Sequence, residues 1–285
     1  METLHGKRAG ILLVYFLVGC GSARTPVPVT LPSPPAVNRS PGSSWAFNYT
    51  AGVFRYQISR SAAIESQSDS GSSREISTNV THELITLMPE GDSGISFTAA
   101  IDTFSSTTQG LIGPVQPIQL PAQIAGMFSD SGLTISSDRS GNKCNPVNSV
   151  VVSDIHNLLT RFPARLSQGL VWQDSVSTAG CQAGIPTILH TTRSYIVSGE
   201  AVYEGQPILL IQRTDAIQAS GEGAQQQHSL RLNASGTGNV IYYLDTKGGR
   251  VVRLTAVQEL NLTITTSSRA QRFKESLRQD FRLLP

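Results

Sequence analysis

The sequence has few cysteines and aromatic residues and no excess of either charge. Its 285 residues include 3 cysteines, too few for a disulfide-dense scaffold. The 22 basic residues nearly balance the 20 acidic ones, so the sequence lacks the electrostatic signature of a nucleic-acid-binding protein. Hydrophobic residues still make up 39% of the chain, enough to bury a core, which excludes disorder along the whole chain.

Compact enzyme motifs are missing as well. The chain contains no phosphate-binding Gly-x-x-x-x-Gly-Lys-Ser/Thr loop and no Gly-x-Ser-x-Gly nucleophile elbow. Residues 91–94 (Gly-Asp-Ser-Gly) resemble a serine-protease nucleophile segment, but only His5 and His82 precede them, and a hairpin turn explains them better. The histidines show no metal-ligand spacing. The sequence therefore predicts no catalytic residue, no metal site and no cofactor.

The first residues have the pattern of a secretory signal. Lys7 and Arg8 precede an apolar run over residues 9–18, and small residues follow. This run is shorter than the roughly 20 residues that a transmembrane helix needs. We therefore expect residues 1–19 to be a signal peptide that is removed.

The end of this segment, Leu17-Val18-Gly19-Cys20, resembles the lipobox of bacterial lipoproteins. The resemblance implies cleavage between Gly19 and Cys20, lipid on the Cys20 thiol, and the membrane as a partner through that lipid. Gly21 follows, which in a bacterium with two membranes favours the periplasmic face of the outer membrane. The alternative is an ordinary secreted protein whose signal ends in a chance cysteine.

Residues 20–44 are rich in proline and carry few charges, which is typical of a semi-rigid spacer. We interpret them as a tether between the lipidated cysteine and a β-rich envelope domain over residues 45–285. The strand patterns before and after a central helical stretch also suggest two similar halves, 45–150 and 151–285.

The body of the chain reads as a mainly β (α+β) fold with a curved antiparallel sheet. Apolar and polar residues alternate in several runs, as in strands with one packed face. Glycine-rich and polar clusters predict turns at 89–94, 203–206, 233–238 and 245–249. Helices are expected from Ser153 to Phe162, capped by Ser153, and over residues 120–128. The C-terminal segment fits either a strand or a helix.

This layout resembles the half-barrel or clamshell sheets of envelope lipoproteins of the lipoprotein-carrier type. The resemblance implies an open curved sheet that wraps helices over an apolar cavity. We expect the concave face to be lined by apolar residues such as Phe97, Ile101, Leu209 and Ile211.

Two cysteines remain once Cys20 is lipidated. In an oxidising envelope such a pair forms a disulfide more often than not, so Cys144 and Cys181 are predicted to be bridged. Closing that loop would stabilise the fold by about 3 to 4 kcal/mol.

Three functions remain open. The first is a non-enzymatic, membrane-anchored envelope lipoprotein whose curved sheet binds a hydrophobic ligand or an envelope protein. The second is a structural or assembly component of an envelope complex. The third is a hydrolase with dispersed catalytic residues, which a cleft joining His156 or His190 to a carboxylate and a hydroxyl would indicate.

Overall fold

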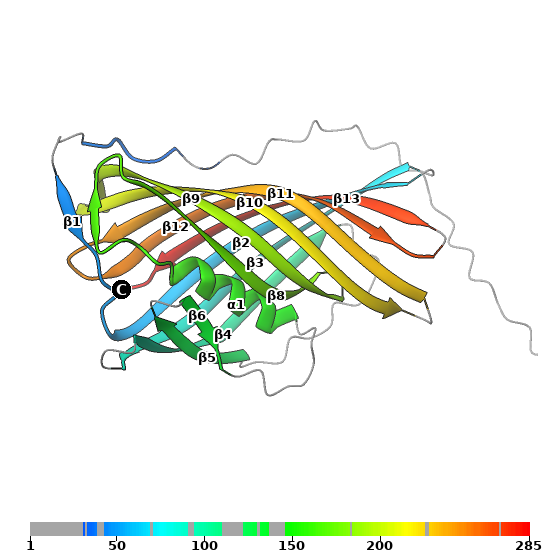
Figure 1. Cartoon of the computed structure of the whole chain (residues 1–285), viewed down its shortest axis with the longest axis horizontal. Helices are drawn as coiled ribbons and strands as arrows, with labels where there is room; N and C mark the ends of the chain where they lie inside the picture. The colour runs from blue at the N-terminus through cyan, green and yellow to red at the C-terminus, as the bar shows by residue number, and fades with distance from the viewer. Residues whose placement is uncertain are drawn as a thin grey trace, which may run out of the picture.

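The computed structural model describes residues 31, 33–38, 43–68, 71–90, 94–109, 122–129, 132–136, 146–182, 184–225, 228–267 and 269–285. Within them the chain forms one helix and thirteen strands (Figure 1). In chain order these are β1 (Ser44–Ala46), β2 (Gly52–Ser68), β3 (Gly71–Pro89), β4 (Ile95–Gln109), β5 (Ala122–Ser129), β6 (Gly132–Ile135), α1 (Pro146–Leu158), β7 (Arg165–Ser167), β8 (Val171–Gln182), β9 (Ile185–Tyr203), β10 (Gln206–Gln225), β11 (His228–Asp245), β12 (Arg250–Thr265) and β13 (Ala270–Leu283).

Eleven of these strands form one antiparallel sheet. Its order is β6-β5-β4-β3-β2-β13-β12-β11-β10-β9-β8, so β6 and β8 are its edges. Strands that are neighbours in this sheet are also neighbours in sequence, except where β2 pairs with β13 and joins distant parts of the chain. A separate small sheet pairs β1 with β7. Strands from residues 45–150 and from 151–285 therefore lie in a single sheet.

The sheet is curved into a half-barrel, and α1 lies on its open side (Figure 1). The helix contacts β4 and β5 near one edge and β8 at the other. Pro146 stands in its first turn, where a missing N–H is tolerated. Its valine-rich sequence is a modest helix former, so packing against the sheet supplies most of its stability.

The main core lies between the concave face and the inward side of α1. Val151, Ile155 and Leu158 are spaced so that they share one helix face, and all three are buried. They join concave-face side chains such as Phe281 and Leu254, which are fully buried. Each such side chain stabilises the fold by about 1.5–3 kcal/mol.

Part of the predicted tether packs against the convex face. Leu31 and Val37 contact a buried cluster that includes Leu210 and Tyr243. Gly199 permits this approach, because a Cβ there would lie 2.7 Å from Val37 Cγ1. The sheet is thus covered on both sides at this end, which explains why the runs 208–211 and 240–244 are buried without alternation.

The mainly β fold and its curved antiparallel sheet are confirmed, and so are the turns at 203–206 and 245–249. Three local predictions are wrong. Residues 122–129 form β5 instead of a helix, the turn expected at 233–238 lies inside the continuous strand β11, and α1 begins at Pro146 and ends at Leu158, which leaves Ser153 inside it and Phe162 beyond it. The C-terminal segment is the strand β13.

In the described part of the chain, no helix combines the length and the apolar character needed to span a membrane.

Candidate functional site

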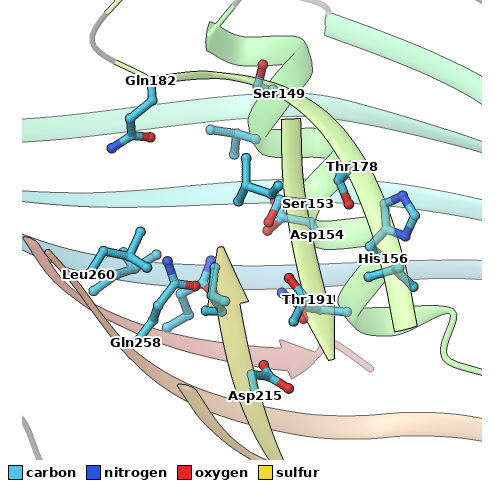
Figure 2. A pocket seen from close by; sticks show the side chains of 18 of the residues that line it. Ser149, Ser153, Asp154, His156, Thr178, Gln182, Thr191, Asp215, Gln258 and Leu260 are labelled. Atoms are coloured by element: carbon cyan, nitrogen blue, oxygen red, sulfur yellow. The ribbon is translucent and has the colours of Figure 1, made fainter. Parts of the chain in front are cut away.

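A cavity of about 380 Å³ lies on the concave side, between α1, β8 and the strands curled beneath them. This volume is at the lower end of the range for small-molecule sites. Ser153 and Ala179 line the cavity and are exposed, so it is open to solvent along the helix and the edge strand. Figure 2 shows side chains of α1, such as Ser149 and Ser153, together with Gln258 and Leu260 from the sheet.

Direct cross-strand partners share a face, so the concave face at and beside the cavity can be described by rows that run across the sheet. What we call the middle row is Asp174, Arg193, Asp215, Gly238, Gln258 and Leu277. The core-side row, nearer the packed core, is Trp172, Tyr195, Arg213, Val240, Ala256, Gln279 and Arg60. The outer row, on the other side of the middle row, is Val176, Thr191, Ile217, Gly236, Leu260 and Glu275.

Two glycines make room on this face. At Gly236 an added Cβ would lie 2.0 Å from the Glu259 carbonyl oxygen and 2.6 Å from Leu260 Cδ2. At Gly238 it would lie 3.2 Å from a carboxylate oxygen of Asp215. Gly236 therefore brings the backbone of β12 closer than a larger residue would permit, and Gly238 leaves room beside the Asp215 carboxylate.

The strong curl of the sheet closes the far side of the cavity. Gln182, at the end of the edge strand β8, donates a hydrogen bond of 2.5 Å to Glu275 of β13. In the sheet order β13 is separated from β8 by four strands, so this contact crosses the concave space. Burial raises the pKa of Glu275, and the bond from Gln182 lowers it in part.

Arg193 and Asp174 form a two-pronged ion pair at one end of the middle row. The Arg193 Nε–Asp174 Oδ1 and Nη2–Oδ2 distances are 2.7 and 2.6 Å. Tyr195, on the same strand as Arg193, stacks on Trp172 with ring centroids 4.7 Å apart. The guanidinium also donates from Nη1 to the His156 backbone oxygen of α1 at 3.4 Å, so it is held between a carboxylate, the helix and an aromatic wall.

Arg213 connects the sheet to the helix. It donates to Asp215 Oδ2 at 2.8 Å and to Asn157 Oδ1 of α1 at 2.9 Å, and it also donates to the Tyr242 hydroxyl. The side chains of Arg213 and Asp215 are 5% and 7% exposed. Because a buried charge needs a partner, this arginine fixes both the strand and the helix that border the cavity.

A second buried ion pair links β2 to the helix. Arg60 donates to Asp154 of α1 and, at 2.9 Å, to Thr81 Oγ1. Glu83 is fully buried beside them, with its nearer carboxyl oxygen 3.9 Å from Arg60 Nη2. Burial raises the pKa of Glu83 well above its usual range, and Asp154 raises it further. The protonated form of Glu83 is therefore favoured, and Arg60 and Asp154 remain the charged pair.

His156 lines the cavity in an unusual state. Burial, and then the nearby positive charge of Arg193, lower the pKa of His156 to about 4. The cavity also contains hydroxyls of Ser149, Ser153 and Thr191. However, no hydrogen bond joins the His156 ring to a hydroxyl or a carboxylate among the described residues. The cavity therefore contains the residue types that a dispersed hydrolase requires, but no contact between a base and a nucleophile is found among the described residues.

The four residues expected to line an apolar cavity lie in the packed core. Phe97, Ile101, Leu209 and Ile211 are all at most 1% exposed and belong to the cluster that packs against α1. The cavity is lined by other residues, further along the strands.

The remaining predicted site residues are only partly described. Gly19, Cys20 and Cys144 lie outside the described residues. Cys181 lines the cavity and is not a free thiol, while its pairing with Cys144 stays a prediction. His190 is exposed and contacts Ser177, at 2.8 Å from Nδ1 to Oγ.

Sequence reasoning missed the buried arginines. The alternation Ile211, Arg213, Asp215, Ile217 places two charged residues on the same strand face as two core residues. Such inward charges are a signal of a polar site within an apolar face, since charged residues are rarely buried without a partner. Among the described residues, no group of three or more His, Cys, Asp or Glu is placed to hold a metal ion.

Comparisons with known proteins give little. No protein-family model matches the chain, and no curated protein matches its sequence. Neisserial surface protein A is matched over 82% of this chain and 99% of its own, with 9% identity and a TM-score of 0.21. An outer membrane channel from Pseudomonas putida is matched over 87% of this chain and 100% of its own, with 8% identity and a TM-score of 0.20. At such scores these likenesses carry no inference about this chain.

Proposed function

We propose that this protein is a lipid-anchored, non-enzymatic binding protein of the cell envelope, on the periplasmic face of the outer membrane where two membranes exist. It binds one small ligand in the concave cavity. The observation that carries this proposal is the cavity itself, bordered by a helix, an edge strand and a tightly curled sheet and open to solvent between the first two. The lipobox at Leu17–Cys20 supports the anchor.

The size of the cavity limits the ligand. Its volume of about 380 Å³ is near the lower end of the roughly 300–1,000 Å³ typical of small-molecule sites. A lipid with two or three long acyl chains is much larger than this, so the cavity is suited to a small molecule or a single short chain.

Binding explains the arrangement better than catalysis does. Two carboxylates that line the cavity are paired with arginines, Asp154 of α1 with Arg60 and Asp215 of β10 with Arg213. A general base must reach the proton it removes, and neither these groups nor His156 contacts a hydroxyl nucleophile in the described residues.

Native mass spectrometry of the full chain, extracted from membranes in polymer nanodiscs, tests the binding role. The wild-type protein should carry a bound small molecule in one-to-one ratio. The variant Thr191→Trp fills the cavity and should lose it, whereas Thr192→Trp, on the exposed opposite face, should retain it. Equal occupancy in the two variants would rule out the cavity as the binding site.

The anchor has a separate test. Cells fed a radiolabelled fatty acid should label the wild-type protein, and the variant Cys20→Ser should carry no label. Equal labelling of both, or of neither, would remove the lipoprotein assignment and leave the binding role untouched.

A second candidate function, docking on another envelope protein, is favoured by a patch on the convex face. Val53, Leu84, Met88 and Met127 are large apolar residues with exposures of 64%, 40%, 49% and 37%. Pairing places Met88 and Met127 on either side of Ser96, so these two form one surface. Crosslinking in cells through a photoreactive residue at Met88 should then capture one partner in constant ratio, while the same residue at exposed Ile188 should not.

A further inference from the structure

Among the described residues that line the cavity near the helix, every charge has a partner. Arg60, Arg193 and Arg213 are paired with Asp154, Asp174 and Asp215, one carboxylate for each guanidinium. Glu275, the one carboxyl of the described lining without an arginine partner, lies in the outer row, where it accepts a hydrogen bond from Gln182 and burial raises its pKa. Near the helix, burial lowers the pKa of His156 to about 4, which leaves its ring uncharged at neutral pH. An ionic ligand group placed here would lose its hydration without finding a free counter-ion, which costs several kcal/mol.

Hydrogen-bonding groups without charge are abundant in the same place. Asn157 on the helix wall and Thr191, Gln258 and Gln279 on the sheet all line the cavity. The side-chain oxygen of Asn79 is buried and accepts no hydrogen bond from any described residue. A buried acceptor of this kind is satisfied by a ligand that brings a hydroxyl or amide N–H.

The outer part of the cavity is apolar. Val176 and Leu189 on one wall and Ile217 and Leu260 on the other line it. Ile217 and Leu260 also belong to a buried apolar cluster with Leu232, so this side of the cavity continues into a second, smaller core. Polarity therefore changes along the strands, from the charged rows near the main core to an outer row that is mostly apolar and contains one carboxyl, that of Glu275.

From this gradient we infer that the ligand is a single-chain amphiphile with an uncharged, hydroxyl-rich head group. The head lies on the middle row, against Gln258 and the helix wall, and a short apolar chain lies toward Ile217 and Leu260. This inference rests on the proposed function and specifies the ligand class of the same site.

Three probes that share an n-octyl chain test the head group: n-octyl β-glucoside, n-octyl sulfate and n-octyltrimethylammonium. Each is titrated calorimetrically, below its critical micelle concentration, into the full-length protein in nanodiscs. The glucoside should bind one-to-one and at least tenfold more tightly than either ionic probe. Shortening the alkyl chain of the glucoside by one methylene should weaken its binding about fourfold. Tighter binding of an ionic probe, or equal binding of all three, would overturn the inference.

A charge placed in the cavity provides the matched variant. Gln258→Arg, combined with Glu275→Gln because Glu275 is a diagonal neighbour on β13, adds a guanidinium without a carboxylate partner and should reverse the preference, so that the sulfate binds at least tenfold more tightly than the glucoside. Gln212→Arg, on the exposed face of β10, should behave as wild type. If both variants keep the wild-type preference, the head group does not lie on the middle row, and the inference fails.

Failure of this inference differs from failure of the proposed function. If the native ligand is lost in Thr191→Trp but the glucoside does not bind, the cavity is a binding site for another class of molecule. If occupancy is the same in Thr191→Trp and Thr192→Trp, the cavity is not the site for any ligand.

Discussion

The two ends of the concave face belong to the same strands, yet one is a packed core and the other encloses a cavity. At the core end, β10 and β11 present large side chains such as Leu209 and Tyr242. At the cavity end β11 presents Gly236 and Gly238. The helix follows this division, with Val151, Ile155 and Leu158 toward the core and Ser149 and Ser153 toward the cavity. Side-chain volume, more than sheet geometry, thus decides where the half-barrel is filled.

The largest expected difference between the two ends comes from truncating a large side chain in β13. Phe281→Ala should lower the free energy of unfolding by about 4 kcal/mol, because Phe281 is fully buried in the core. Leu277→Ala, on the same strand face at the cavity, should cost less than about 2 kcal/mol, since Leu277 is only half-buried. Chemical denaturation measures both. Similar costs would mean that the cavity end is packed as tightly as the core.

Breaking the buried ion pair between Arg60 and Asp154 should have the next largest effect. Asp154→Asn removes the carboxylate that Arg60 contacts directly and leaves only the carboxyl of Glu83, 3.9 Å away, to serve as its counter-ion, and we expect a loss of about 3 kcal/mol. Glu83→Gln should cost little at neutral pH, because the amide that it introduces keeps a hydrogen-bond donor where the protonated acid has one. Chemical denaturation at neutral pH compares the two variants.

The pH dependence of these variants sharpens that comparison. The pKa of Glu83 is raised in the folded state, so the folded protein binds the extra proton, and this contribution to stability is lost as pH rises above the unfolded value. Glu83→Gln should therefore be more stable than wild type at alkaline pH. A Glu83→Gln variant as unstable as Asp154→Asn would contradict a protonated Glu83.

A smaller effect is expected from filling the concave face beside the cavity. Gly236→Ala should destabilise the protein by about 2 kcal/mol, because its Cβ would collide with the Glu259 backbone. Gly180→Ala should be nearly neutral, since its Cβ would meet only Leu189 Cδ1, at an ordinary 3.6 Å. Thermal unfolding of the two variants side by side gives the comparison, and equal melting temperatures would argue against close approach at Gly236.

The difference between the two ends also explains what the sequence could predict. Alternation of apolar and polar residues correctly indicated a mainly β chain, because a strand with one packed face imposes a period of two. Glycine and asparagine near 233–238 predicted a turn, but Gly236 and Gly238 serve the close packing of a continuous strand. A glycine that gives room inside a strand and one that ends it look alike in a single sequence.

The secondary structure of the C-terminal segment and the position of the cavity could not be assigned from the sequence. Phe273, Leu277 and Phe281 are four residues apart, a spacing that shares one face in a helix and in a strand alike, and pairing with β2 and β12 decides for a strand. The cavity depends on which strands curl together, as in the Gln182–Glu275 contact. Such long-range contacts leave no trace in local spacing, so neither the ion pairs nor the cavity lining could be assigned from the sequence.

The last predicted effect, which appears only below neutral pH, concerns His156 of α1, which lines the cavity. Burial and Arg193 lower the pKa of His156 to about 4. Between pH 4 and the unfolded value near 6.5 the unfolded chain binds more protons, so stability should rise with pH across this window by about 2 to 3 kcal/mol. His156→Gln should remove that rise, whereas His190→Gln, on the exposed face, should leave it intact. Chemical denaturation of the variants at pH 4.5 and pH 7 measures this rise. If the His156→Gln variant keeps the full rise, another group causes it. The cavity end would then tolerate a charged imidazole beside Arg193, against the expectation from its pKa.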